Sequence, residues 1–188
     1  MRNPALPLAL VALLFAAPAS AQVLDTTSQR LDLAGDAPAA CVFTQPTAGN
    51  ASNASFTPTG AASGRINVTQ LVDATNATSL ASSIELVLPL VCNAANRVEV
   101  RSANGGLLRV GGTAGGSGAF SEFLAYRVGL DWAGLTLDRS SDAGAAGLDS
   151  ASPRTGEVRL RVTTPAGSGP LVAGQYNDTI TVDFQVAY

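Results

Sequence analysis

The sequence predicts an all-β fold, an antiparallel β-sandwich formed by one domain. Five segments alternate apolar and polar residues with a period of two, and stretches rich in Gly, Pro, Asn and Ser separate them. A strand with this alternation places one row of side chains in a core and the other in water. After residue 21, no segment of comparable length has the period of a helix. Short strands with turns between them are typical of a sandwich.

The first 21 residues have the features of a secretory signal peptide. Arg2 precedes an apolar stretch over residues 6–17, and Ala19-Ser20-Ala21 has the small residues of a cleavage site. The apolar stretch is too short to span a bilayer. We therefore expect cleavage after Ala21 and an exported chain, without a transmembrane segment, that begins at Gln22.

Residues 22–40 are expected to form an N-terminal arm rather than part of the core. Large apolar residues are sparse, and Leu31, Leu33 and Gly35 occupy alternate positions. Pro38 lacks a backbone donor and ends the pattern. Such an arm would become a strand only when a sheet edge is offered to it. A disordered linker is the alternative interpretation.

Cys41 and Cys92 are the only cysteines. In an exported chain we expect them to form a disulfide, with two unrelated buried thiols as the alternative. Closing a loop of this length stabilises a fold by about 4 kcal/mol in the chain-entropy model.

The alternating segments predict the strands and the core. Asn104-Gly105-Gly106 suggests a hairpin, residues 142–152 are expected to be irregular, and residues 165–174 link the last two strands. The predicted inward-facing residues are Ile84, Leu86, Leu88, Leu90 and Cys92, then Val98 and Val100, then Tyr126, Val128, Leu130 and Trp132, then Val158, Leu160 and Val162, and finally Ile180, Val182, Phe184, Val186 and Tyr188.

The composition excludes several kinds of chemistry. The chain has no His and no Lys, so it lacks the Ser-His-Asp triad, imidazole metal ligands and Schiff-base lysines. Its net charge of -3 argues against a nucleic-acid surface. We expect no enzyme, no metal and no cofactor.

Three sets of acidic or aromatic residues could serve a function, but each also fits an ordinary structural role. A Ca²⁺ site at Asp138, Asp142 and Asp149 lacks a known spacing, so a solvated acidic loop is preferred. A glycosidase pair of Glu122 and Asp131 is disfavoured because Asp131 has the outward parity of its strand. Trp132, at the inward parity, is assigned to the core rather than to a sugar-binding platform.

The C-terminal segment GEVRLRVTTPAGSGPLVAGQYNDTITVDFQVAY, residues 156–188, resembles the end of spore coat protein U domains, the subunit domains of archaic chaperone–usher pili. The matching features are the Pro165-Ala166-Gly167 turn, the pattern Gly174-x-Tyr176-x-Asp178-Thr179, and an alternating strand that ends in an aromatic residue. Tyr126-Arg127-Val128 is similar to a central strand of the family. The resemblance extends over most of residues 41–188 but is loose between residues 41 and 83.

The resemblance implies an incomplete immunoglobulin-like sandwich, completed by donor-strand exchange. A periplasmic chaperone and then the arm of a neighbouring pilin subunit, added at an outer-membrane usher, would cover the open edge. Leu31, Leu33 and Gly35 would be the donor residues. Val182, Phe184 and Val186 would contribute to the acceptor groove, and Tyr188 with its carboxylate would contact the chaperone.

The implied function is that of a secreted structural subunit of a cell-surface pilus, for surface attachment and biofilm formation. Because a head-to-tail contact does not close on itself, it would form a fibre. The sequence leaves two alternatives open: a spore or cyst coat protein, and a lectin-like carbohydrate-binding module that uses loops 111–118 and 138–152. The final strand, residues 179–188, could alternatively be an ordinary core strand that does not border a groove.

Overall fold

The computed structural model describes residues 30–115 and 118–186. The chain divides into two compact units, Met1–Asp36 and Ala37–Tyr188. In the first unit the described residues, 30–36, form no strand and are exposed, and Arg30 pairs with Asp32 at 2.8 Å. The signal peptide expected over residues 1–21 lies outside the described residues.

The described part of the second unit consists of strands and one short 3-10 helix. None of its helices is long and apolar enough to cross a membrane. The elements are β1 (Cys41–Phe43), β2 (Thr47–Ser52), β3 (Ala54–Gly60), β4 (Ser63–Val68), β5 (Ser82–Cys92), β6 (Asn96–Ser102), β7 (Leu107–Arg109), β8 (Phe123–Leu124), β9 (Arg127–Trp132), β10 (Leu135–Ser140), η1 (Ser141–Ala143), β11 (Ala146–Ser150), β12 (Arg154–Thr164), β13 (Tyr176–Asn177) and β14 (Ile180–Val186).

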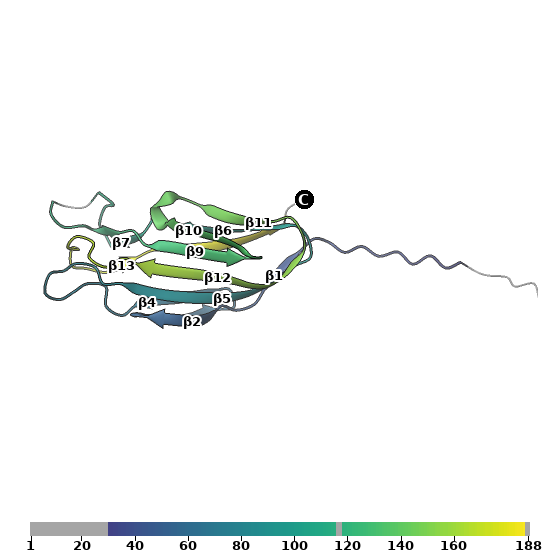
Figure 1. Cartoon of the computed structure of the whole chain (residues 1–188), viewed down its shortest axis with the longest axis horizontal. Helices are drawn as coiled ribbons and strands as arrows, with labels where there is room; N and C mark the ends of the chain where they lie inside the picture. Colours follow the sequence, from purple (N-terminus) through teal and green to yellow (C-terminus); the bar gives the residue numbers. More distant parts are fainter. Residues whose placement is uncertain (1–29, 116–117, 187–188) are drawn as a thin grey trace, which may run out of the picture. The chain divides into compact units, whose positions relative to one another are not determined.

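Two antiparallel sheets form the body of this unit. The larger has the order β1–β5–β12–β9–β10, and β2 pairs with β5 along the same edge as β1. Figure 1 shows β9, β12, β5 and β2 side by side. The second sheet has the order β11–β6–β14, while β13–β7–β8 and β3–β4 form two small additional sheets. The prediction of an all-β, antiparallel fold is confirmed.

One apolar core lies between the two main sheets. The side chains of β5, β6, β9 and β12 alternate between buried and less buried positions, as the sequence predicted. Val98 and Val158 are completely buried. Trp132 is 1% exposed, and its ring N–H donates to the side-chain oxygen of Asn96 at 2.8 Å. The assignment of Trp132 to the core is therefore confirmed.

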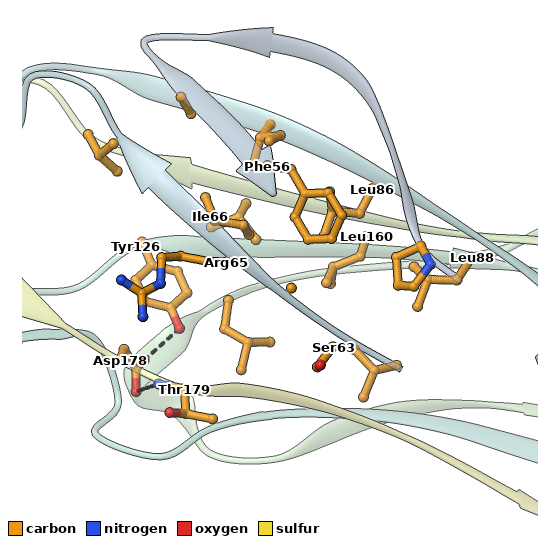
Figure 2. A pocket seen from close by; sticks show the side chains of 18 of the residues that line it. Phe56, Ser63, Arg65, Ile66, Leu86, Leu88, Tyr126, Leu160, Asp178 and Thr179 are labelled. Atoms are coloured by element: carbon orange, nitrogen blue, oxygen red, sulfur yellow. Dashed lines mark hydrogen bonds between the residues drawn. The ribbon is translucent and has the colours of Figure 1, made fainter. Parts of the chain in front are cut away.

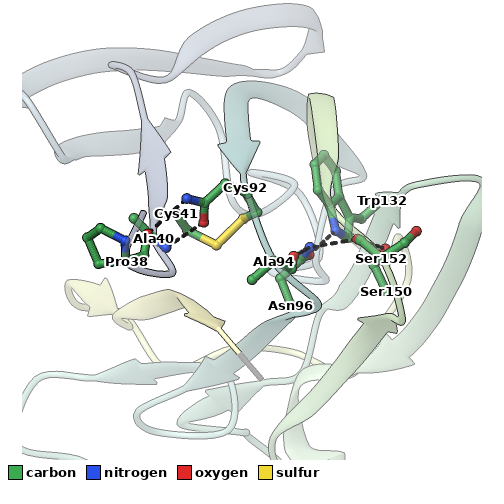
Figure 3. The surroundings of a disulfide bond; sticks show 10 residues. Pro38, Ala40, Cys41, Cys92, Ala94, Asn96, Trp132, Ser150 and Ser152 are labelled. Carbon is green, nitrogen blue, oxygen red and sulfur yellow. Dashed lines mark hydrogen bonds between the residues drawn. A yellow bond between two sulfur atoms is a disulfide. The ribbon is translucent and has the colours of Figure 1, made fainter. Parts of the chain in front are cut away.

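The predicted disulfide between Cys41 and Cys92 is confirmed, and it joins directly opposed residues of β1 and β5. Figure 3 shows the bond with Pro38 and Ala40 nearby. The next residue of the chain after Cys92, Asn93, makes a second connection to this segment. The Asn93 side chain accepts from the Ala40 backbone N–H at 2.7 Å and donates to the Pro38 carbonyl at 2.9 Å. These contacts fasten residues 38–40 to the end of β5.

Two local predictions are wrong. No hairpin forms at residues 104–106, because the strands on either side of them do not pair with each other. β6 pairs with β11 and β14, whereas β7 belongs to the small sheet with β13 and β8. Residues 142–152 are not irregular: they contain part of η1 and the strand β11. All five residues of β11 pair with β6. Ladder hydrogen bonds of this kind do not depend on side chains, so residues of low strand preference can be held in a strand.

Candidate functional site

The last strand, β14, has an incompletely covered inner face. It pairs with β6 in a register that sets Val182 opposite Val100 and Phe184 opposite Val98. Val98 and Val100 are 0% and 5% exposed, but Val182 and Phe184 are only half-buried. Within the described residues, β14 pairs with no strand other than β6. It is therefore an edge strand with apolar side chains that still contact solvent. The free backbone groups of such an edge can pair with a further strand.

A cavity of about 450 Å³ lies against this inner face. Its floor is formed by apolar residues of β5 and β12, and β14 contributes Ile180, Val182 and Phe184. Figure 2 shows Leu86, Leu88 and Leu160 pointing into the same space. We call this cavity the β14 groove. Its lining is suited to take up apolar side chains from a segment laid along β14.

An aromatic contact joins β1 to β14 at the β14 groove. The rings of Phe43 in β1 and Phe184 in β14 lie 5.3 Å apart between centroids, and both residues line the groove. Because Phe43 lies two residues after Cys41, the disulfide and the register of β1 hold this ring in place. The contact joins the edge of the larger sheet to β14.

A partly buried hydrogen-bond network lies at the other end of β14. Asp178 accepts hydrogen bonds from the hydroxyl of Tyr126 at 2.6 Å and from that of Ser102, and from the backbone N–H groups of Asn104 at 2.9 Å and Thr179 at 2.7 Å. The pKa of the Tyr126 hydroxyl is far above its ordinary value, mainly because the hydroxyl is buried and also because it donates a hydrogen bond to Asp178. The hydroxyl therefore stays protonated and remains a hydrogen-bond donor. Asp178, which belongs to the sequence pattern Gly174-x-Tyr176-x-Asp178-Thr179, therefore has a structural role.

Residues of the same pattern, Gly174 and Tyr176, pack against Arg109. A Cβ at Gly174 would lie 3.0 Å from the Arg109 side chain, and the Gly174 φ of 152° is one that other residues rarely adopt. The Tyr176 hydroxyl lies 2.8 Å from the carbonyl oxygen of Val172. The pattern therefore orders the loop that leads into β14.

The hairpin β3–β4 borders the β14 groove and was not predicted. Phe56 and Ile66 are directly opposed in it and pack against the core. Gly64 allows this packing, because a Cβ there would overlap the Phe56 ring. Two short alternations on either side of residues 60–62 are the only sequence signal for it, and most of their residues are polar or small.

Searches for related proteins found no match to this chain among family models, curated proteins or solved structures.

The structure brings some of the predicted site residues together. Val182 and Phe184 line the β14 groove, as does Ile180, which was not named as a groove residue. Val186 is half-buried opposite Asn96 but does not line the groove. Tyr188 lies outside the described residues.

The predicted donor residues belong to the other unit of the chain. Leu31 and Leu33 are 93% and 98% exposed, and no atom lies within 4 Å of a Cβ built at Gly35. Full exposure of two leucines leaves apolar surface that a partner strand or groove can cover.

The acidic residues considered as catalytic or metal-binding groups have other partners. Asp138 pairs with Arg127, and Asp149 pairs with Arg97. Asp131 lies opposite Thr136 and Arg159 in the larger sheet. Among residues 30–115 and 118–186, no group of three or more His, Cys, Asp or Glu side chains is placed to hold a metal ion.

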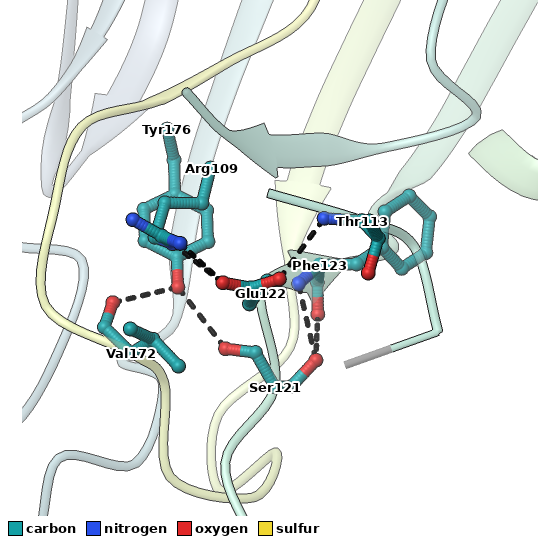
Figure 4. Close-up of polar contacts among 7 residues, drawn as sticks. All are labelled: Arg109, Thr113, Ser121, Glu122, Phe123, Val172 and Tyr176. Atoms are coloured by element: carbon teal, nitrogen blue, oxygen red, sulfur yellow. Dashed lines mark hydrogen bonds and ion pairs between the residues drawn. The ribbon is translucent and has the colours of Figure 1, made fainter. Parts of the chain in front are cut away.

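Glu122 is buried in a polar cluster at β7 and β8. Its carboxylate accepts from the Arg109 Nε–H at 2.9 Å and from the Thr113 backbone N–H at 3.0 Å (Figure 4). The hydrogen bond from Thr113, followed by that from Arg109, lowers the pKa of the Glu122 carboxyl below its ordinary value of 4.5. The charged form therefore helps to hold the start of the loop after β7.

We expect E122Q to destabilise the fold at neutral pH and to make its stability less sensitive to acid. A carboxyl whose pKa is lowered on folding stabilises the protein above its unfolded pKa, and this contribution disappears as the pH falls through the folded pKa. The difference in unfolding free energy between wild type and E122Q should therefore shrink below pH 4.5. Urea unfolding at a series of pH values measures it. A difference that stays constant from about pH 7 to about pH 3 would contradict the assigned role.

Proposed function

We propose that this chain is a secreted structural subunit that assembles head to tail, each copy placing its N-terminal arm in the β14 groove of the next. The observation that carries the proposal is the half-buried inner face of β14, an edge strand that lines an apolar cavity. The exposed, alternating Leu31 and Leu33 supply side chains of the matching kind. Added strands gain affinity from main-chain hydrogen bonds and specificity from alternate side chains in pockets.

The class of assembly we propose is an archaic chaperone–usher pilus that serves attachment and biofilm formation. The sequence resemblance of residues 156–188 supports it, since the Tyr176 and Asp178 positions of that resemblance order the entrance to β14. In this proposal the fold is an immunoglobulin-like sandwich that lacks one strand. A periplasmic chaperone covers β14 before assembly at an outer-membrane usher.

The test compares the chain from residue 22 onward with one that begins at residue 37. The shorter chain keeps residues 38–40, because Asn93 binds their backbone. We expect the longer chain to form oligomers whose size grows with concentration, and the shorter one to remain monomeric and to unfold at a lower temperature. A synthetic peptide of residues 22–36 should raise that temperature, since a ligand that binds only the folded state stabilises it. Sedimentation velocity and thermal unfolding are the measurements.

Equal solubility, equal stability and a monomeric state for both chains would refute the proposal. A peptide in which Leu31 and Leu33 are replaced by Asp is the matched control. It should leave the unfolding temperature of the shorter chain unchanged.

A further inference from the structure

The pair Asn104-Gly105 lies in the segment 103–106 between β6 and β7, which belongs to no strand. Asn104 is exposed, and Gly105 has a φ of 74°, a conformation that residues with a Cβ rarely adopt. Of the asparagines in the sequence, Asn104 alone precedes a glycine. Because glycine has no Cβ, its backbone nitrogen can approach the preceding side chain more closely than that of any other residue.

The backbone N–H of Gly105 has no hydrogen-bond partner within residues 30–115 and 118–186. The two preceding N–H groups do have partners. That of Ala103 donates to the Thr179 carbonyl at 2.9 Å. That of Asn104 donates to the Asp178 carboxylate at 2.9 Å. The pair therefore combines an exposed amide side chain with an unengaged backbone nitrogen next to it, the two groups that form a cyclic imide.

We propose that Asn104 is a site of spontaneous deamidation in the folded protein. The Gly105 nitrogen attacks the Asn104 Cγ. As the new N–Cγ bond forms, the Cγ–Nδ2 bond breaks, and the side-chain nitrogen leaves as ammonia with the proton of the Gly105 amide. Water then opens the cyclic imide and leaves at position 104 either an aspartate or an isoaspartate, in which the main chain runs through the side-chain carboxyl carbon. Nothing is oxidised or reduced, and water is the only co-reactant.

Both products place a new negative charge beside the residue that holds the start of β14. The Asn104 Nδ2 donates to the Asn177 carbonyl at 3.3 Å, and its backbone N–H donates to Asp178. A carboxylate cannot donate, so the bond to Asn177 is lost. The new charge is also repelled by the nearby Asp178 carboxylate. Because Asp178 lines the β14 groove, the reaction loosens the groove at this end.

The isoaspartate product also lengthens the main chain where there is little room for it. The Gly105 carbonyl accepts from the Ser141 hydroxyl at 2.6 Å. A Cβ at Gly106 would lie 2.6 Å from the Phe123 ring, so the backbone there already packs closely. The Ser141 hydroxyl in turn accepts from the Tyr126 backbone N–H at 3.0 Å. A displaced Gly105 therefore disturbs Tyr126, whose side chain is also part of the network at β14.

Peptide mapping by mass spectrometry tests the reaction on the folded chain from residue 22 onward, incubated for weeks at neutral pH. We expect the amide-to-carboxyl mass change at position 104 to accumulate at least several-fold faster than at the other asparagines, with isoaspartate among the products. N104Q is the matched control, since its longer side chain closes a ring less readily, and it should stay unmodified. If the urea-unfolded chain is modified at this position and the folded chain is not, or if neither is, the inference is wrong.

The effect on β14 is tested with N104D, which reproduces one of the products. N50D adds the same charge at an exposed position of β2. We expect N104D to lower the unfolding temperature by about 2 °C or more and to speed amide exchange in Ile180–Val186. N50D should do neither. Equal behaviour of N104D and the wild type would overturn the link between this position and β14.

Discussion

Replacing Leu31 and Leu33 by Asp should prevent assembly of the chain from residue 22 onward while leaving the fold of residues 37–188 unchanged. Each leucine that becomes buried contributes about 1.5–3 kcal/mol, and an unpaired carboxylate in an apolar groove adds a large desolvation cost. The association constant between copies should therefore fall by at least about a hundredfold, since each 1.4 kcal/mol corresponds to about a factor of ten. Sedimentation velocity at several concentrations measures the change.

Ala34 provides the matched control, because neighbouring residues of an extended chain point to opposite sides. A34S should assemble like the wild type. If L31D/L33D also assembles like the wild type, the two leucines do not enter a groove. A loss of assembly accompanied by a lower unfolding temperature of the monomer would show instead that the arm stabilises its own domain.

Removing the disulfide should have the largest effect on the stability of the monomer. In the chain-entropy model, a crosslink between residues 51 positions apart stabilises the fold by about 4 kcal/mol. We expect C41A/C92A to lose most of this free energy of unfolding and, with it, part of its assembly, because β1 also positions Phe43 against Phe184. Urea unfolding under non-reducing conditions measures the loss.

Val42 lies on the same strand, is 65% exposed and takes no part in the crosslink. V42A should therefore change stability by less than about 1 kcal/mol. A similarly small effect of C41A/C92A would mean that β1 is held by its ladder with β5 alone, and that the crosslink adds nothing to the fold.

The strands that the sequence predicted share a feature that the missed strands lack. In β5, every second residue is buried from Ser82 to Cys92, so the core imposes an alternation on the sequence. All six residues of β2 are exposed, and most residues of β3 and β4 are exposed as well. Backbone pairing suffices to hold such strands, so the core imposes little alternation on their sequences. β11 was missed for a similar reason, because its sequence is dominated by small residues.

The candidate site was harder to predict than the fold. β12 and β14 have the same alternation, yet Val158 and Leu160 are buried while Val182 and Phe184 are only half-buried. A pattern records which side chains face inward, but it does not record whether another layer covers them. The resemblance over residues 156–188 indicated that the last strand borders the groove. Only the packing in the structure identified Ile180 and the hairpin residues Phe56 and Ile66 as parts of the groove.

The connection between Cys41 and Cys92 also determines how the domain responds to mechanical tension. A pull on residues 37–40 cannot peel β1 away from β5 one hydrogen bond at a time, because a covalent bond carries the load across that ladder. The tension passes to β5, which is paired with β12 over eleven residues. Extending the domain from this end then requires many hydrogen bonds between β5 and β12 to break together, so the domain resists tension applied through residues 37–40.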